Sequence, residues 1–449
     1  MSALRPNARN ARNAAPTGLP PGAALLFAVA AGASVANVYF AQPLLATLGA
    51  DFGIGERAVG AVVTLTQLGY GIGLLLLVPL GDRLDRKRLA VAQMLTLAVA
   101  LTAVATAQSP AVLFAAFAAV GLLAVVTQLL VASAAALADE ASRGRVVGTV
   151  TAGIVVGILL ARTVAGLLAD AAGWRSVYAA SAVLSVAVAA ALARILPSGG
   201  ARPTPPPYRK LLGSLPELLR TEKLFRQRAA IALLLFASFG TLWSSVALPL
   251  SEPPYTLSHS AIGAFGLAGA AGALAASPAG RLADRGYARH VTGGGLALLA
   301  LSWLPLAATT STLWALVVGA IVLDLAVQAV HVTNQTVLYA LRPDAGSSLI
   351  GGYMVFYSLG SALGAITATT LYAAAGWHAV CALGAAFALT GLGVWALGER
   401  RGRRARSSAA AASGGQDIRT STPELRKRST QSANHEAPAS AACRAATSE

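Results

Sequence analysis

One apolar stretch, residues 312–340, contains the side chains best suited to carry a proton. Asp324, Gln328, His331 and Gln335 follow one another along it at steps of four, three and four residues. In a helix these steps place all four side chains on one stripe. An acid and an imidazole inside an apolar segment are costly and commonly functional. We therefore predict proton coupling at Asp324 and His331, with a structural or substrate-binding role as the alternative.

A third ionisable group, Arg162, lies inside the apolar stretch 146–169. A guanidinium at the centre of a bilayer costs about 3 kcal/mol or more unless it is paired or reaches the membrane surface. We expect Arg162 to face protein, to take part in coupling, and to pair with Asp324, a backbone carbonyl or a substrate anion. Snorkelling of the side chain to the outer surface is the alternative.

Amides and an indole interrupt several apolar stretches. An amide without a hydrogen bond costs several kcal/mol in hydrocarbon, so these side chains must face protein or water. They either hold neighbouring helices together or line a cavity for a substrate. The residues predicted to line the cavity are Asn37, Gln42, Gln67, Gln128, Trp243, Gln328, Asn334 and Gln335.

The scaffold that positions these groups must be a membrane protein. Of 449 residues, 56% are hydrophobic and 12% are charged, which is too apolar for a soluble domain. A helix crosses a bilayer with about 20 apolar residues, whereas barrel strands would be shorter and alternating. The sequence predicts twelve transmembrane helices, near 23–48, 58–80, 89–107, 111–137, 146–169, 176–196, 229–250, 260–279, 290–309, 312–340, 348–374 and 379–398.

The distribution of arginine and lysine predicts how these helices are oriented. Alternate loops are basic, and short basic loops stay in the cytoplasm. Both termini are then cytoplasmic, and we expect a multi-pass protein of the cytoplasmic (inner) membrane. The same loop-by-loop distribution accounts for the net charge of +16. We therefore expect a lipid bilayer, and no nucleic acid, as a partner.

Two parts of the chain repeat each other. The block that contains Asp82-Arg83 returns as Asp284-Arg285, and Ala172-Gly173-Trp174-Arg175 returns as Ala375-Gly376-Trp377-His378 at nearly the same offset. A duplicated six-helix unit explains both. The predicted organisation is an N-terminal arm (1–20), a first bundle (21–196), a cytoplasmic linker with an amphipathic helix (197–228), a second bundle (229–398) and a disordered tail (399–449).

Two related halves, with Asp82-Arg83-Leu84-Asp85-Arg86-Lys87 after the second helix, resemble the major facilitator superfamily. The stretch Asn37-Val38-Tyr39-Phe40-Ala41-Gln42-Pro43 is similar to its twelve-helix efflux permeases, which include sugar-efflux and drug:proton antiporters. The resemblance implies an all-α integral membrane fold with two pseudo-symmetric six-helix bundles. The chain departs from the antiporters in two places. Phe117 stands where they have an arginine on helix 4, and Gly157-Ile-Leu-Leu-Ala-Arg162 replaces their glycine- and proline-rich motif on helix 5.

The resemblance also implies a cytoplasmic gate. In it an acid at one helix end meets the positive N-terminus of a helix in the other half, with an arginine nearby. By this likeness Asp82 meets helix 11 near Ser347, and Asp284 mirrors it at helix 5. A basic loop that only sets topology is the alternative. The residues assigned to this gate are Asp82, Arg83, Arg86, Arg143, Arg145, Asp284 and Arg285.

Together these features predict a secondary active transporter that exports a small organic molecule by alternating access, driven by proton antiport. Proton-coupled uptake is the alternative within transport, and a receptor or an intramembrane enzyme are the alternatives from other classes. No lysine follows a glycine, so the phosphate loop of an ATP-driven pump is missing. Cys381 and Cys443 form no metal-binding or disulfide pattern. We expect a monomer without enzymatic activity, cofactor or metal, whose partners are the substrate and protons.

Overall fold

The computed structural model describes residues 22–139, 142–196, 208–273, 276–341 and 346–419. Within these ranges the chain is helical and has no strand. It divides into two compact units, Met1–Ala396 and Leu397–Glu449. The predicted N-terminal arm and residues 197–207 of the predicted linker lie outside the described residues.

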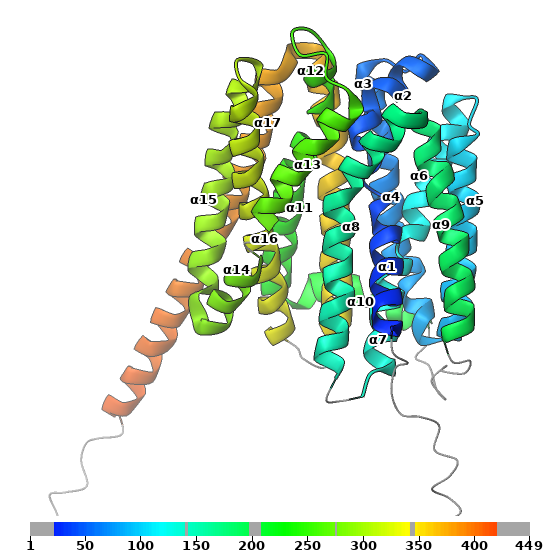
Figure 1. Cartoon of the computed structure of the whole chain (residues 1–449). Coiled ribbons are helices and arrows are strands. Elements are labelled where there is room, and N and C mark those ends of the chain that lie inside the picture. The colour runs from blue at the N-terminus through cyan, green and yellow to red at the C-terminus, as the bar shows by residue number, and fades with distance from the viewer. Residues whose placement is uncertain (1–21, 140–141, 197–207, 274–275, 342–345, 420–449) are drawn as a thin grey trace, which may run out of the picture. The chain divides into compact units, whose positions relative to one another are not determined.

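The first half of the larger unit is a bundle of upright helices (Figure 1). Its apolar, alanine- and leucine-rich segments satisfy their backbone hydrogen bonds within each helix, as a membrane requires. The elements are α1 (Ala23–Ala36), η2 (Gln42–Leu44), α2 (Leu45–Phe52), α3 (Glu56–Val59), α4 (Ala61–Leu76), η3 (Val78–Asp82), α5 (Arg86–Ala105), α6 (Pro110–Ala124), α7 (Val126–Leu137), α8 (Arg143–Ala172) and α9 (Trp174–Ile195).

The second half begins with a short amphipathic helix and continues as another bundle. α17 starts in the larger unit and continues into the smaller one. The elements are α10 (Tyr208–Thr221), α11 (Lys223–Trp243), α12 (Ala247–Ser251), α13 (His259–Ala273), α14 (Ala276–Leu282), the π-helical turn η4 (Ala283–Tyr287), α15 (Ala288–Ala307), η5 (Ala308–Thr310), α16 (Leu313–Leu341) and α17 (Gly346–Arg419).

All twelve predicted apolar stretches contain helix, but their boundaries differ from the prediction. Nine helical segments among the described residues are long and apolar enough to cross a membrane. The first stretch is divided at residues 37–44, where Pro43 lies in a 3-10 turn, as its missing backbone donor predicts. The last two stretches share the label α17, but Gly376 between them has non-helical backbone angles (φ 72°, ψ −170°), so the chain kinks there between two helices.

The predicted repeat has a structural counterpart at the turn from α8 to α9 and at the kink within α17. Gly173 and Gly376 adopt positive φ angles of 79° and 72°, a conformation that glycine reaches without strain. A tryptophan follows each glycine. The Trp174 indole donates to Asp51 Oδ2 at 2.8 Å, and the Trp377 indole donates to the Leu306 carbonyl at 2.8 Å. At both corners a glycine with positive φ turns the chain, and the indole of the next residue anchors the following helix by a hydrogen bond.

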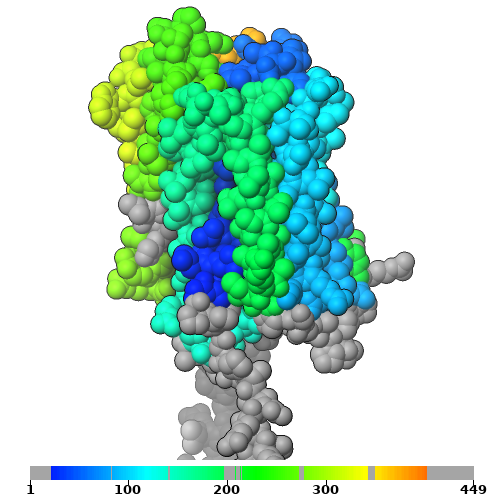
Figure 2. Space-filling view, turned by 45° about the vertical axis from the view of Figure 1, so that its right-hand side comes forward, coloured from blue at the N-terminus to red at the C-terminus, as the bar shows by residue number. Residues whose placement is uncertain are grey.

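Small residues on α8 allow α1 to approach closely. A Cβ atom on Gly153 would lie 2.4 Å from the Ala28 carbonyl oxygen, and one on Gly157 would lie 2.3 Å from that of Gly32. Both distances are too short for any residue but glycine. Figure 2 shows α1, in dark blue, between α8 and α9.

Two helix boundaries differ from the predicted ones. The tail was expected to be irregular from residue 399, but α17 continues to Arg419, since alanine and arginine dominate this segment and both favour helix. Helix 7 was expected to begin at residue 229, but α11 begins at Lys223. Charged residues at its start are tolerated because they precede the apolar part. Residues 420–449, which include Cys443, lie outside the described part.

Candidate functional site

Arg162 lies inside the bundle, on the side of α8 that faces the second half. Its side chain is only 2% exposed, so it does not snorkel to the surface. Nε donates a hydrogen bond to Gln42 Oε1 at 2.7 Å. The guanidinium carbon lies 3.9 Å from the ring centroid of Trp243, and 5.4 and 5.7 Å from those of Tyr39 and Phe239. The charge is therefore held by one amide and three aromatic rings.

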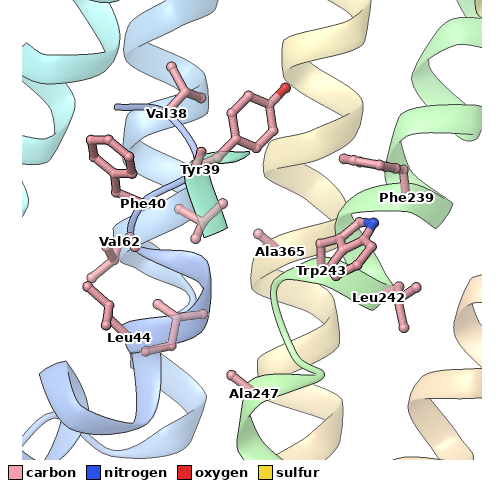
Figure 3. Packing of buried hydrophobic residues seen from close by; sticks show 14 of the residues in the cluster. Val38, Tyr39, Phe40, Leu44, Val62, Phe239, Leu242, Trp243, Ala247 and Ala365 are labelled. Atoms are coloured by element: carbon pink, nitrogen blue, oxygen red, sulfur yellow. The ribbon is translucent and has the colours of Figure 1, made fainter. Parts of the chain in front are cut away.

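Trp243 connects Arg162 to the carboxylate predicted to carry the proton. Its ring face contacts the guanidinium, and its indole N–H donates to Asp324 Oδ1 at 3.1 Å. Arg162 belongs to the first half, whereas Trp243 on α11 and Asp324 on α16 belong to the second. Figure 3 shows Tyr39 of the first half facing Phe239 and Trp243. The site is therefore assembled across the interface between the two halves.

A row of glycines on α13 makes room for both charges. Gly263, Gly266, Gly269 and Gly272 stand at every third residue. A Cβ on Gly266 would lie 3.1 Å from the Arg162 Cβ, and one on Gly269 only 2.0 Å from Asp324 Oδ2. The sequence reasoning missed this row, although its regular spacing is visible in the sequence.

The structure is closed around the guanidinium. A cavity of about 10 Å³ borders it, which is too small for anything larger than a single water molecule. Nη2 of Arg162 has no hydrogen-bond partner among the described residues. The cavity is lined by Gln42, Pro43, Arg162, Trp243, Val246, Ala247 and Ile262.

The predicted stripe on α16 divides into separate clusters. His331 bonds the Tyr353 hydroxyl through Nδ1 at 2.9 Å and the Gln335 amide through Nε2 at 3.2 Å. Its ring packs edge-on against Phe236. Gln328 is half-buried between this cluster and Asp324. His331 therefore belongs to a second polar cluster, about two helical turns from the carboxylate.

Next to this second cluster, the halves meet through two tyrosines. The hydroxyl of Tyr39 hydrogen-bonds the hydroxyl of Tyr357 on α17. Tyr357 packs on Phe236, which also contacts His331. The tyrosine pair thus lies between the Arg162 cluster and the His331 cluster.

Asn334 lies farther along α16, about 15 Å from Asp324 by the helical rise. Its Oδ1 accepts a hydrogen bond from Arg228 Nη1 at 2.8 Å, and Arg228 also donates to Thr292 Oγ1 at 3.0 Å. Arg228 is 6% exposed, although the sequence placed it in the linker. The sequence missed this arginine because the start of α11 was predicted six residues too late.

The other predicted cavity residues lie outside the Arg162 cluster. Asn37 accepts from Ser181 on α9 at 2.7 Å and donates to the Ala33 carbonyl at 2.9 Å. Gln128 donates to the Tyr70 hydroxyl at 3.4 Å. Gln67 is buried, and its Oε1 has no hydrogen-bond partner among the described residues. Gln42 and Trp243 are thus the predicted cavity residues that contact Arg162.

The upper ends of the two halves are joined by an acid that the sequence reasoning did not assign. Asp170, on the last turn of α8, accepts from the backbone N–H groups of His259 and Ser260, at 3.1 and 2.8 Å. The His259 ring adds a bond of 2.7 Å to the same carboxylate. Thr64 on α4 also donates to the Ala362 carbonyl of α17 at 3.1 Å.

The predicted gate at the lower end remains a prediction. The side chains of Asp82 and Ser347 lie outside the described residues. Arg86 donates to the carbonyl oxygens of Gly81 and Ala132, and Arg143 donates to that of Ala135, so both hold the first half together. Arg83 is half-buried; the other gate residues are exposed, namely Arg145, Asp284 and Arg285.

Comparisons with known proteins agree with this architecture. The family model described as Major Facilitator Superfamily matches residues 26–253 and 231–435. The uncharacterized transporter YgaY of Escherichia coli O157:H7 is 46% identical over 383 residues, covering 85% of this chain and 97% of that protein.

Two solved structures share the fold. A bacterial homologue of the human lysosomal transporter Spinster, in an inward-facing and unoccupied conformation, superposes with a TM-score of 0.72 at 15% identity, covering 85% of this chain and 97% of that chain. The human organic anion transporter MFSD10 gives a TM-score of 0.59 at 17% identity, covering 84% and 100%.

Proposed function

The chain belongs to the major facilitator superfamily and is a multi-pass membrane transporter, and on this basis we propose that it exports a small organic molecule across the cytoplasmic membrane in exchange for protons. Alternating access moves the two halves against each other about a central site. The basic loops support the lower end in Figure 1 as the cytoplasmic end.

The observation that carries the proposal is the contact of Arg162 and Asp324 with one indole across the interface. Arg162 stacks on Trp243 at 3.9 Å, and Trp243 donates to Asp324 at 3.1 Å. When the two halves separate at this level, the guanidinium of Arg162 moves away from the indole. The positive charge that offsets the buried carboxylate of Asp324 then lies farther away. A carboxylate in a low dielectric takes up a proton when it loses the neighbouring positive charge that offsets its own. Proton uptake by Asp324 is therefore linked to the movement of the halves.

His331 has a supporting role in this proposal. It lies about two turns from Asp324 and is held by Tyr353 and Gln335. The tyrosine pair Tyr39 and Tyr357 separates it from Arg162 in the closed arrangement. His331 would relay a proton toward the lower end only after this pair parts.

Transport in vesicles tests the proposal once a substrate is known. A growth screen of cells that make or lack the protein, across drugs, sugars and amino acids, supplies that substrate. In vesicles, wild type should concentrate it when a pH gradient is imposed, whereas Asp324→Asn should only equilibrate it. Asp139→Asn, which changes an acid on an exposed loop, should behave as wild type. Wild-type accumulation that ignores the gradient, or a gradient response in Asp324→Asn, contradicts the proton role; His331→Gln reports whether the imidazole is needed.

A further inference from the structure

The charges and unused hydrogen-bonding atoms of the Arg162 cluster indicate what kind of molecule it accepts. We propose, building on the transport function proposed above, that the substrate is a small zwitterion with a carboxylate and a protonated amine, as in an α-amino acid. The carboxylate binds Arg162, and the ammonium binds Asp324.

The unused atoms point to a ligand with an acceptor at one end and a donor at the other. Nη2 of Arg162 is buried without a hydrogen-bond partner. At the other end, the indole of Trp243 occupies Oδ1 of Asp324, and Oδ2 accepts no hydrogen bond in the described part of the chain. A carboxylate supplies the missing acceptor to the guanidinium. An ammonium supplies the missing donor to the carboxylate.

The balance of charge selects a zwitterion over a simple ion. Arg162 and Asp324 together are neutral, and both are nearly fully buried, at 2% and 4% exposure. A lone anion or cation would leave a net charge in a site of low dielectric, which is costly. A zwitterion keeps the sum at zero.

The surrounding rings also suit such a ligand. Tyr39, Phe239 and Trp243 present aromatic surface around the guanidinium. Ring faces attract an ammonium group and pack against an apolar side chain. In this closed arrangement the indole of Trp243 lies between the two charges. A zwitterion that enters when the halves separate takes the place of the contacts that the indole makes with both of them.

The assignment explains why substrate and proton would exclude each other. An ammonium group requires the ionised form of Asp324, so a bound substrate and a proton on that carboxylate compete. Among the described residues, the charged and titratable groups that act on Asp324 are Arg162 on α8 and Tyr39 in the turn after α1. An anionic substrate would have the opposite effect, because it occupies Arg162 and favours a proton on Asp324. Exchange therefore follows from a zwitterion, and co-transport from an anion.

Binding to the purified, detergent-solubilised protein tests the inference directly. The probes are matched sets of a free amino acid, its carboxamide and its N-acetyl derivative, made from alanine, leucine, glutamine and phenylalanine. These present a zwitterion, a cation and an anion on one skeleton. Quenching of tryptophan fluorescence reports binding next to Trp243. In at least one set the zwitterion should bind about tenfold or more tightly than its carboxamide and its N-acetyl derivative.

Charge variants separate a binding role from a structural one. Arg162→Gln should shift the preference toward the carboxamide, and Asp324→Asn toward the N-acetyl derivative. Arg194→Gln, which removes an exposed arginine of α9, should keep the wild-type order. The inference is overturned if an anion or a cation binds as tightly as its zwitterion, or if no set binds.

The two proposals can fail separately. The binding measurement uses no pH gradient, so zwitterion binding without gradient-driven transport rejects proton exchange and keeps the substrate class. Gradient-driven transport of a molecule that lacks either charge keeps proton exchange and rejects the substrate class.

Discussion

The carboxylate of Asp170 holds His259 through both its backbone N–H group and its ring, and so joins the end of α8 to the start of α13. A carboxylate at a helix N-terminus meets unpaired N–H groups and the positive end of the helix dipole. The resemblance to transporters predicted this arrangement for Asp82 at the cytoplasmic end. The structure shows such a contact at the opposite end, where the carboxylate at the end of α8 meets the N-terminus of α13.

Removing the charge of Asp170 should loosen the upper closure. Asp170→Asn keeps the shape but weakens three hydrogen bonds that involve His259 and Ser260. The test uses a chain with Cys381→Ser and Cys443→Ser and a reporter thiol, Ile262→Cys, in the lining of the small cavity beside Arg162. We expect an impermeant thiol reagent to label this thiol several-fold faster with Asp170→Asn than without it. Equal labelling rates in the two backgrounds would show that the contact does not hold this end closed.

Asp51→Asn is the matched control for the labelling experiment, since Asp51 lies at the same end but forms its hydrogen bonds within the first half.

The hydrogen bond from the Trp174 indole, with that from Arg175, holds the pKa of Asp51 below its usual value of 3.8. A lowered folded-state pKa means that the ionised form stabilises the fold at neutral pH and that this contribution disappears as the pH falls below that value. The melting temperatures of wild type and Asp51→Asn should therefore differ by the same small amount between about pH 5 and 8, and converge in stronger acid. A difference that fades near neutral pH would count against the assignment.

Gly269 tests the position of the carboxylate. A Cβ there would lie 2.0 Å from Asp324 Oδ2 and 2.9 Å from Trp243 Cζ2, so Gly269→Ala must displace the acid or the indole. We expect transport to fall about tenfold or more, although alanine favours helix by about 1 kcal/mol over glycine. Gly294→Ala, where nothing lies within 4 Å of the new Cβ, should keep transport and gain stability. Normal transport by folded Gly269→Ala would place Asp324 elsewhere during the cycle.

The indole should couple the two charges energetically. Trp243→Phe keeps an aromatic face for Arg162 but removes the donor to Asp324, so transport should fall while the protein stays folded. In the wild-type background, Arg162→Ala and Asp324→Asn together should cost less transport than the sum of the separate losses. In the Trp243→Phe background that non-additivity should shrink. Strict additivity of the two changes in the wild-type background would mean that the charges act independently.

Local patterns in the sequence were enough to predict most of the fold. The apolar stretches predicted the helices. The break at Pro43 and the close helix contact at Gly153 and Gly157 follow from the types of these residues. Each of these depends on neighbours within a few turns of helix. After residue 398 the lack of an apolar period predicts disorder, whereas α17 continues to Arg419 because helix propensity there is high.

The site depended on contacts that no local pattern contains. Gln42 and Arg162 are 120 residues apart, and Trp243 and Asp324 are 81 residues apart. The ionisable residues could be identified singly, because an acid or an arginine in an apolar stretch is conspicuous. That one indole contacts both charges follows only from the packing of α8, α11 and α16.

Proton movement during transport tests the central claim most directly, namely that Asp324 exchanges a proton for substrate. Vesicles that contain the purified protein and a pH-sensitive dye in the lumen receive the identified substrate on the outside. We predict that wild type makes the lumen more alkaline as substrate enters and protons leave, and that Asp324→Asn leaves the lumen pH unchanged. Acidification of the lumen by wild type, or the wild-type signal from Asp324→Asn, would contradict the account.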